Sequence, residues 1–318
     1  MTTLIFVIAA LHALFATINA TTIKSVMKEK GIYSQVVPAI LATASYPKNQ
    51  SPAGQIPLDE PWVSEVATSA FTPQTVESLS TAVIDGSFGW LEGKTASPEF
   101  SFDLTPNKQI LADKVGEYVT KRSASLPVCT LADLQSLSAD INLYTAPCRP
   151  AMISPEQAGQ SARAQVLSDQ NFLKDPVINS ANLKENSGVS PFDSLKPLRV
   201  LYSNQSSFLL GFVLLTVLFA AGGVSTAKNR IDGLRRLFRL LLTAGIGLSI
   251  FTFFMWLGSK RLSNIGSSEP ILSKVMVPII NGLVQKALVS YVLIIVLTFA
   301  LASLTYAGYR YAKLKQTS

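Results

Sequence analysis

Histidine is nearly absent from this chain: among 318 residues the only one is His12, which lies in an apolar stretch. Ser–His–Asp triads, Cys–His pairs and the common zinc sites all require imidazole groups, so none of these sites is expected in the part of the chain that follows His12. A histidine in an apolar span can relay protons or bind a metal. No carboxylate or cysteine stands at helical spacing from His12, and we therefore interpret it as a hydrogen-bonded packing residue.

Other signatures of catalysis are missing as well. The glycine-containing segment Gly86–Gly89 lacks the lysine that a phosphate-binding loop requires. In an extended segment, Glu99 and Asp103 lie about 13 Å apart, too far for paired acid–base catalysis. Asp85 and Glu92 are two helical turns apart and pair no better, so we expect solvated surfaces at both places. The sequence predicts no enzyme activity, no cofactor and no metal site.

Cysteine is scarce, and its two occurrences, Cys129 and Cys148, lie in the same polar part of the chain. They form no Cys-x-x-Cys pattern and have no histidine nearby, which argues against a redox or metal role. An even number of cysteines in an oxidising compartment indicates a disulfide. A bridge that closes a loop of this size contributes about 3 kcal/mol of stability.

Charged residues make up only 15% of the chain, and four stretches contain none: Leu4–Ala20, Phe208–Ala227, Leu240–Gly258 and Ala287–Gly308. A helix needs about 20 apolar residues to cross a bilayer. The last three stretches meet that requirement, and the first lies at its lower limit. A cleaved signal peptide is the alternative for the first stretch, but it lacks a basic leading segment, and we predict that it is retained as a span.

The charges are divided unequally between the spans and the polar block. Residues 21–205 carry 15 Lys and Arg against 18 Asp and Glu, whereas the rest of the chain carries 12 against 2. Five of these bases crowd one short segment: Lys228, Arg230, Arg235, Arg236 and Arg239. Arg310, Lys313 and Lys315 follow the last span. Short basic segments beside spans stay in the cytoplasm and contact anionic lipid headgroups, so nucleic-acid binding is not expected.

These patterns predict a mainly α membrane protein at the cell membrane, with four transmembrane helices and a mostly helical extracytoplasmic domain that has one disulfide and little β structure. Lys24, Lys28 and Lys30 after the first span oppose this orientation, but the eight cytoplasmic bases outweigh them. The predicted organisation is a span over 1–20 with a cytoplasmic N-terminus, the outer domain 21–205, a span over 206–227, a basic loop 228–239, a span over 240–258, an outer hairpin with an amphipathic helix 259–286, a span over 287–309 and a cytoplasmic tail 310–318.

Within the outer domain, apolar residues at helical period predict that the first span continues as a helix toward Ala44, with a bend near Pro38. We expect short helices over 61–70 and 130–138. Three further helices are predicted by a hydroxyl residue followed by proline: Thr72-Pro73, Thr105-Pro106 and Ser154-Pro155, the last with Gln157 completing a capping box. The first of these ends at Gly93 and buries Val76, Leu79, Val83 and Trp90, and the second buries Ile110, Leu111, Val115, Tyr118 and Val119. Alternation over 99–104 indicates a short strand or an extended segment, and 175–194 is predicted to be a mostly polar connection.

A second apolar stripe begins at Ile271, is interrupted by Pro278 and leads into the last span. The first and last spans therefore both have amphipathic extensions. We predict that these extensions pack on each other or on the large domain, near Val36 and Ile279. Glycines in the apolar stretches, namely Ala221-Gly222-Gly223, Gly245 and Gly247, predict close contacts between helices, with hinge motion as the alternative.

The motifs Trp90–Gly93, Phe100–Leu104, Leu126–Cys129 and Cys148–Pro150 resemble those of uncharacterised bacterial membrane proteins with one large extracytoplasmic domain. The resemblance implies a bacterial cell envelope and transfers no functional residue. We expect a non-enzymatic envelope protein whose outer domain contacts another protein, the cell wall or its own copies. The alternative is a subunit of an oligomeric channel or gated pore, lined by Ser and Thr and capped by the outer domain.

Overall fold

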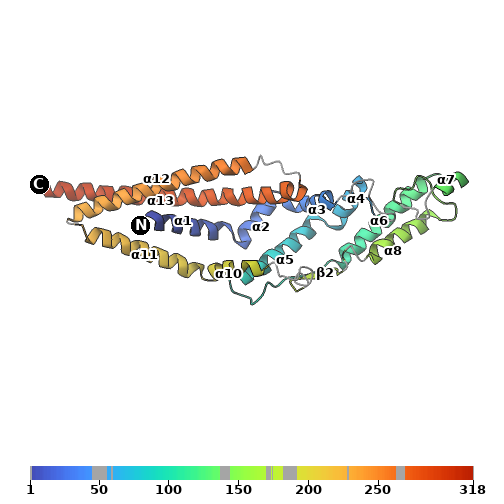
Figure 1. Ribbon diagram of the computed structural model, residues 1–318, viewed down its shortest axis with the longest axis horizontal. Helices are drawn as coiled ribbons and strands as arrows, with labels where there is room; N and C mark the ends of the chain where they lie inside the picture. The colour runs from blue at the N-terminus through green and yellow to red at the C-terminus, as the bar shows by residue number, and fades with distance from the viewer. Residues whose placement is uncertain are drawn as a thin grey trace.

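The computed structural model describes residues 2–44, 56–58, 60–136, 144–169, 173, 175–181, 192–227, 229–262 and 269–317. Apolar helices lie at one end of a long molecule, and a pair of polar helices extends from the other end (Figure 1). The predicted mainly α fold with one disulfide is confirmed. Its sidedness in a membrane stays a prediction.

Four helices form an apolar bundle: α1 (Thr2–Thr17), α11 (Gln205–Ser225), α12 (Arg230–Leu262) and α13 (Val277–Thr317). Three helical segments, over 205–225, 231–261 and 272–315, are long and apolar enough to cross a membrane, and a fourth span results if α1 and the helix after it count as one. Ring contacts between Phe238 and Tyr306 and between Phe251 and Tyr291 show that α12 and α13 run antiparallel. The predicted apolar spans therefore correspond to real helices.

Glycines mediate close packing at only part of the positions that we predicted. A Cβ on Gly245 would lie 3.0 Å from the ring of Phe299, and one on Gly247 would lie 2.7 Å from the ring of Phe6, so both glycines face a neighbouring helix. A Cβ on Gly222 or Gly223 would meet nothing within 4 Å. The prediction for this second pair is wrong within the described chain, because α12 meets the end of α11 on another face.

The helix after the first span is not continuous, which corrects our prediction. α2 (Ala20–Glu29) begins after a 62° bend, and α3 (Ile32–Ala44) begins after a second break. At the bend, the Asn19 side chain accepts a hydrogen bond from the Thr22 amide, at 2.9 Å. This bond caps the start of α2 in place of a helical backbone hydrogen bond. At the second break Gly31 adopts a φ of +63°, which favours glycine. Pro38 lies inside α3.

The remaining helices belong to the polar domain, which we define as residues 20–203. They are α4 (Pro61–Ala70), α5 (Pro73–Leu91), α6 (Thr105–Ser125), α7 (Leu131–Ser136), α8 (Pro155–Ser168), the 3-10 turn η2 (Asp193–Leu195) and α10 (Lys196–Ser203). β1 (Ser101–Asp103) pairs antiparallel with β2 (Val177–Asn179). The strand at β1 is confirmed, whereas β2 corrects our prediction of a polar connection.

Most of the predicted helix ends are confirmed. Thr72 accepts a hydrogen bond from the Thr75 amide, and Ser154 and Gln157 form the expected capping box. Gly93 ends α5 with a φ of +78° and bonds typical of a Schellman motif. The prediction for Thr105 is wrong, because it is the first residue of α6 and its amide donates to the Asp103 carboxylate at 2.8 Å.

The main core lies between α4, α6 and α8. Leu111, Val115 and Val119 are buried there, as predicted, and Trp62 stacks on Tyr118 with ring centroids 4.0 Å apart. Ile110 is 43% exposed, so its predicted burial is wrong. The cause is the close approach of α8 to the face of α6 that carries Ala112 and Gly116, which turns Ile110 outward. In α5, Val76 and Trp90 are buried and Leu79 and Val83 are half-buried.

The two amphipathic extensions pack on each other, which confirms that prediction. Val36 of α3 joins Val275 and Ile279 around a buried cluster of Met27, Ile32, Tyr33 and Val76. Pro278 does not interrupt the last helix, contrary to our prediction. A π-helical turn, η3 (Leu272–Met276), precedes it, and this wider turn accommodates the ring and the missing amide donor of the proline.

The basic segment that we predicted as a loop over 228–239 is largely helical, because α12 begins at Arg230. Likewise α12 continues to Leu262, beyond the predicted span, and α13 extends through the predicted tail to Thr317. Arginine, lysine and leucine are good helix formers. Charge therefore marks where an apolar stretch ends, but it does not mark where the helix ends.

Candidate contact site at the end of the polar domain

α6 and α8 pack side by side and extend away from the apolar bundle (Figure 1). Glycines allow the close approach: a Cβ on Gly159 would lie 1.9 Å from the Thr120 hydroxyl and 2.7 Å from the Gly116 carbonyl oxygen. Ala112, Ala158 and Ala162 complete this small-residue contact. The 21 residues of α6 give a projection of about 31 Å.

The disulfide Cys129–Cys148, as predicted, closes the far end of this helix pair. Backbone hydrogen bonds reinforce the bridge: the Cys129 amide donates to the Arg149 carbonyl at 2.9 Å, and the Arg149 amide donates to the Pro127 carbonyl at 2.8 Å. The segments that follow α6 and precede α8 are thereby tied together, next to α7. We call this end, residues 126–133 and 144–154, the tip.

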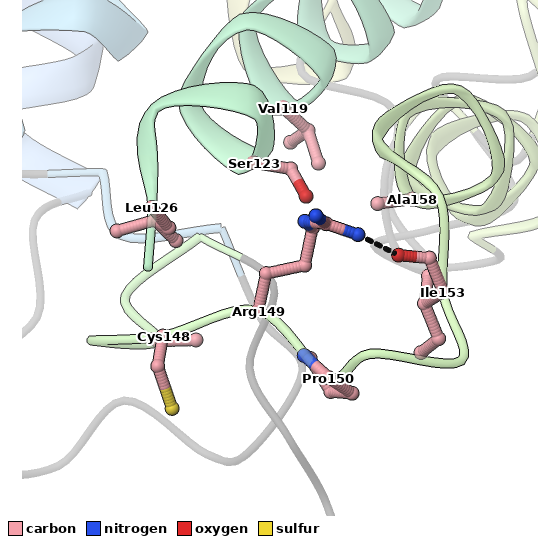
Figure 2. A pocket seen from close by; sticks show the side chains of 9 residues that line it. Val119, Ser123, Leu126, Cys148, Arg149, Pro150, Ile153 and Ala158 are labelled. Atoms are coloured by element: carbon pink, nitrogen blue, oxygen red, sulfur yellow. Dashed lines mark hydrogen bonds between the residues drawn. The ribbon is translucent and has the colours of Figure 1, made fainter. Parts of the chain in front are cut away.

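Two arginines fill the space under the tip. Figure 2 shows the Arg149 guanidinium between Ser123 of α6 and Ala158 of α8, where it donates to the Ile153 carbonyl at 2.8 Å. Arg122 donates to the Ala146 carbonyl at 3.2 Å. These cations therefore hold the backbone of the tip by hydrogen bonds to carbonyl oxygens.

A small cavity of about 20 Å³ lies beside Arg149, lined also by Val119, Leu126 and Pro150. The Nε atoms of Arg122 and Arg149 are buried and have no hydrogen-bond partner among the described protein atoms. A cavity of this size holds one water molecule, and buried donors of this kind usually bond to water. We therefore interpret the cavity as structural.

Apolar side chains project from the tip into solvent. Met152 is 94% exposed, Leu131 is 78% exposed and Val128 is 51% exposed. All three lie within four residues of Cys129 or Cys148, so the disulfide and its hydrogen bonds restrain their backbone. Exposed Met and Leu side chains on a restrained backbone offer adaptable apolar area to a partner. We call these three residues the tip patch.

Polar groups beside the patch are engaged in local structure. Asp133 accepts hydrogen bonds from the hydroxyl and the amide of Thr130, and these bonds lower the pKa of its carboxyl group. Farther from the patch, near the C-terminal end of α8, the Tyr144 hydroxyl donates to Gln165, and burial, together with the charge of Asp169, raises the pKa of Tyr144 to about 12. Asp133 thus stabilises the start of α7, and Tyr144 ties the chain after the tip to α8.

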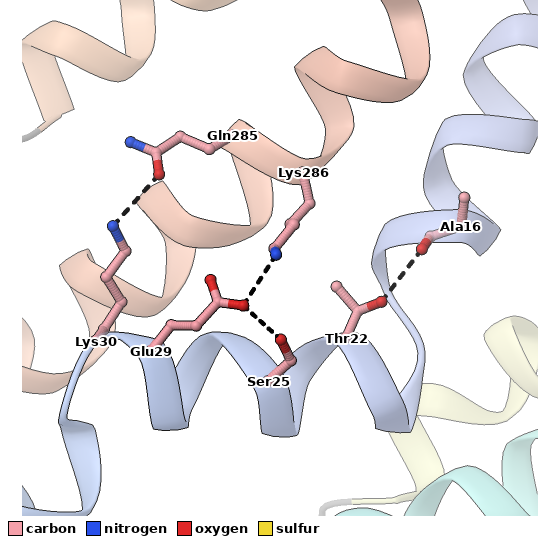
Figure 3. Close-up of polar contacts among 7 residues, drawn as sticks. All are labelled: Ala16, Thr22, Ser25, Glu29, Lys30, Gln285 and Lys286. Carbon is pink, nitrogen blue, oxygen red and sulfur yellow. Dashed lines mark hydrogen bonds and ion pairs between the residues drawn. The ribbon is translucent and has the colours of Figure 1, made fainter. Parts of the chain in front are cut away.

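A polar joint connects the polar domain to the apolar bundle. In Figure 3 the Glu29 carboxylate accepts hydrogen bonds from the Ser25 hydroxyl at 2.7 Å and from the Lys286 ammonium at 3.0 Å. Lys30 donates to Gln285 at 3.3 Å. A Cβ on Gly282 would lie 2.3 Å from Val26, so α2 and α13 approach closely here. On its other side α2 is paired with α5 through Lys24 and Asp85, at 2.7 Å.

The predicted basic residues gather at the opposite end of the molecule from the tip. Arg235, Arg236 and Arg239 are exposed on α12, and Arg310 is exposed on α13. The contact between Phe238 and Tyr306 brings these two helix ends together. Arg230 begins α12, whereas Lys228 lies outside the described residues.

The structure places the chemistry-bearing residues that we examined in the sequence at separate positions. His12 is exposed on α1 and has no hydrogen bond among the described residues, so our interpretation of it as a hydrogen-bonded packing residue is wrong. The neighbouring Ala9 and Ala13 face the bundle core instead. Asp85 pairs with Lys24 and Glu92 with Lys94. The part of the chain that the structure describes contains no group of three metal-ligating side chains.

The tip patch was missed by sequence reasoning. Its signal was weak: Met152 stands between Pro150 and the capping box, in a segment too short for apolar periodicity. No protein-family model, curated protein or solved structure matches this chain. The interpretation of the site therefore depends on its own geometry.

Proposed function

We propose that this protein is a non-enzymatic membrane protein of the cell envelope that binds another protein through the tip patch. The observation that carries the proposal is the exposure of Met152, Leu131 and Val128 at a disulfide-closed end. Large apolar side chains exposed beside one disulfide are candidates for a protein contact. The tight α6–α8 contact holds them far from the apolar bundle.

The orientation in the membrane belongs to the same proposal. The exposed Arg235, Arg236, Arg239 and Arg310 lie beside apolar helices, and such clusters stay on the cytoplasmic side. They contact anionic lipid headgroups there. The tip, at the opposite end, is then outside the cytoplasm, where oxidising conditions maintain a disulfide.

The channel alternative has less support. A polar path needs hydroxyl groups that are available to water or ions. Several hydroxyls of the apolar helices instead donate to carbonyls of their own helix: Thr216 to Phe212, Ser249 to Gly245, Thr252 to Leu248, Thr298 to Ile294 and Ser303 to Phe299. These hydroxyls are satisfied without a pore, which favours a membrane anchor.

Photo-crosslinking from the tip tests the proposal. Met152 is replaced by benzoylphenylalanine in cells. Two further versions of this variant carry a second substitution, either Leu131→Asp in the patch or Val200→Asp on α10. Both substitutions place a carboxylate on an exposed aliphatic position of a helix. We expect one defined protein adduct that Leu131→Asp reduces at least tenfold and Val200→Asp leaves unchanged.

Three outcomes contradict the proposal: adducts with lipid only, no adduct, or an adduct that persists at full yield in Leu131→Asp. Circular dichroism of each purified variant shows that the helices are retained. An adduct between two copies of this chain identifies the partner as a second copy, and the same pair of variants applies to it.

A further inference from the structure

A large cavity lies inside the polar domain, at a distance from the tip patch. Its volume is about 370 Å³, which falls within the range of roughly 300–1,000 Å³ typical of small-molecule sites. The walls come from α3, α4 and α5 and from the bases of α6 and α8. Representative lining residues are Val36, Val66, Leu79, Val115 and Val166.

The lining is almost entirely aliphatic or aromatic. Nineteen of the residues that the structure describes line it, and among these Ser80 and Asp169 alone are polar. A polar ligand would lose its hydrogen bonds to water on entering and gain few in return. The chemistry of the walls therefore selects a hydrocarbon group.

The size of this cavity needs a physical reason. Protein interiors are packed so closely that they hold few voids larger than a water molecule, and this one is partly open to solvent, so its apolar walls forgo the stabilisation that burial would give. Apolar cavities remain free of water but bind apolar molecules. A bound hydrocarbon would restore the missing contacts.

The position of the cavity indicates where that hydrocarbon comes from. α3, which supplies Val36, packs against η3, and η3 leads into α13 of the apolar bundle. One wall of the cavity therefore belongs to the joint with the apolar helices. At another edge, Lys108 donates to the carbonyls of Asp169 and Leu173, which both line the cavity. Polar and charged groups, Lys108 and Asp169, therefore stand at this edge, where the head of a bound amphiphile would meet solvent.

We infer that this cavity binds one acyl chain of a membrane amphiphile. A free fatty acid and a phospholipid supply the same chain chemistry, so the experiment uses both. The probes are palmitate with a terminal diazirine and phosphatidylglycerol vesicles with the same group on one acyl chain. The protein is the full chain, delipidated and held in amphipol.

Val66→Trp fills the cavity from α4, and Leu79→Trp fills it independently from α5. Ile110→Trp is the matched control, because Ile110 is an exposed residue on α6 that does not line the cavity. We expect irradiation to label residues 61–91 in the original protein and in Ile110→Trp. Both filling variants should reduce this labelling at least fivefold.

Thermal unfolding supplies a second readout, because a ligand that binds only the folded state raises Tm. Palmitate should raise the Tm of the original protein and of Ile110→Trp but leave the Tm of the filling variants unchanged. Labelling by one probe alone supports the inference and identifies the source of the chain. Equal labelling of both filling variants, labelling confined to the apolar bundle, or no labelling by either probe would overturn it. These readouts are independent of the tip, so they succeed or fail separately from the proposed function.

Discussion

At the contact between α6 and α8, the missing side chain of Gly159 decides how closely the two helices approach. A Cβ there would lie 2.7 Å from the Gly116 carbonyl oxygen, which is backbone and cannot move aside. We predict that Gly159→Ala destabilises the polar domain by about 1–3 kcal/mol through overpacking. Tryptophan fluorescence follows unfolding, because one of the three tryptophans, Trp62, stacks on Tyr118 of α6.

Gly89→Ala is the control for this prediction. Gly89 lies inside α5, and a Cβ on it would meet nothing within 4 Å. Alanine should therefore stabilise the helix by about 0.5–1 kcal/mol, as it does at unhindered helical positions. Equal effects of the two substitutions would show that the close helix contact does not contribute to stability.

At this scale the sequence predicts well where local chemistry decides the structure. Thr72, Ser154 and Gly93 have the predicted roles because each role depends on bonds within a few residues. Thr105 does not have its predicted role as a helix cap, because Asp103 supplies the competing acceptor for its amide. The predicted burial of Ile110 is also wrong, since it depends on which face of α6 meets α8.

At the scale of elements, the pairing of α2 with α13 depends on the charge of Glu29. Its carboxyl pKa is lowered by the hydrogen bond from Ser25 and then by Lys286. A carboxyl whose pKa is lowered in the folded state stabilises the fold above its ordinary pKa, and this contribution is lost as the pH falls through the lowered value. We predict that the protection of the α2 amides, measured against the intrinsic exchange rate at each pH, falls below about pH 4.

Glu29→Gln separates this effect from general acid unfolding. The glutamine keeps the shape of the side chain but does not titrate. In this variant the α2 amides should be less protected than in the original protein at neutral pH, with little further loss of protection in acid. The amides of α8 serve as an internal reference, because α8 lies far from the joint (Figure 1). A variant with the same acid response as the original protein contradicts the role of Glu29.

The breaks between elements were harder to predict than the elements themselves. The apolar period continues through residues 18–31, so it predicts one helix, yet Asn19 and Gly31 end the helical hydrogen bonding. β2 is only three residues long and pairs across more than 70 positions of sequence with β1. A pairing of that kind leaves no local pattern in either strand.

At the scale of the whole molecule, composition predicts the apolar helices but not the arrangement of the polar domain. The absence of charge over some 20 residues is enough to identify a span candidate. The tip patch and the large cavity have no such signal. The tip patch arises at the end of the α6–α8 pair, and the large cavity arises where five helices from distant parts of the chain meet. Both depend on which helices contact each other, and composition does not reveal that.

The proposed orientation can be tested at the two ends of the molecule. Met152→Cys places a thiol at the tip, and Leu314→Cys places one at the end of α13; both positions are exposed. The native cysteines are joined in a disulfide and do not react. We expect a membrane-impermeant maleimide to label Met152→Cys in intact spheroplasts and to label Leu314→Cys only after the membrane is opened. The converse pattern would place the tip in the cytoplasm, where a structural disulfide is rarely maintained, and would contradict both the orientation and the proposed contact outside the cell.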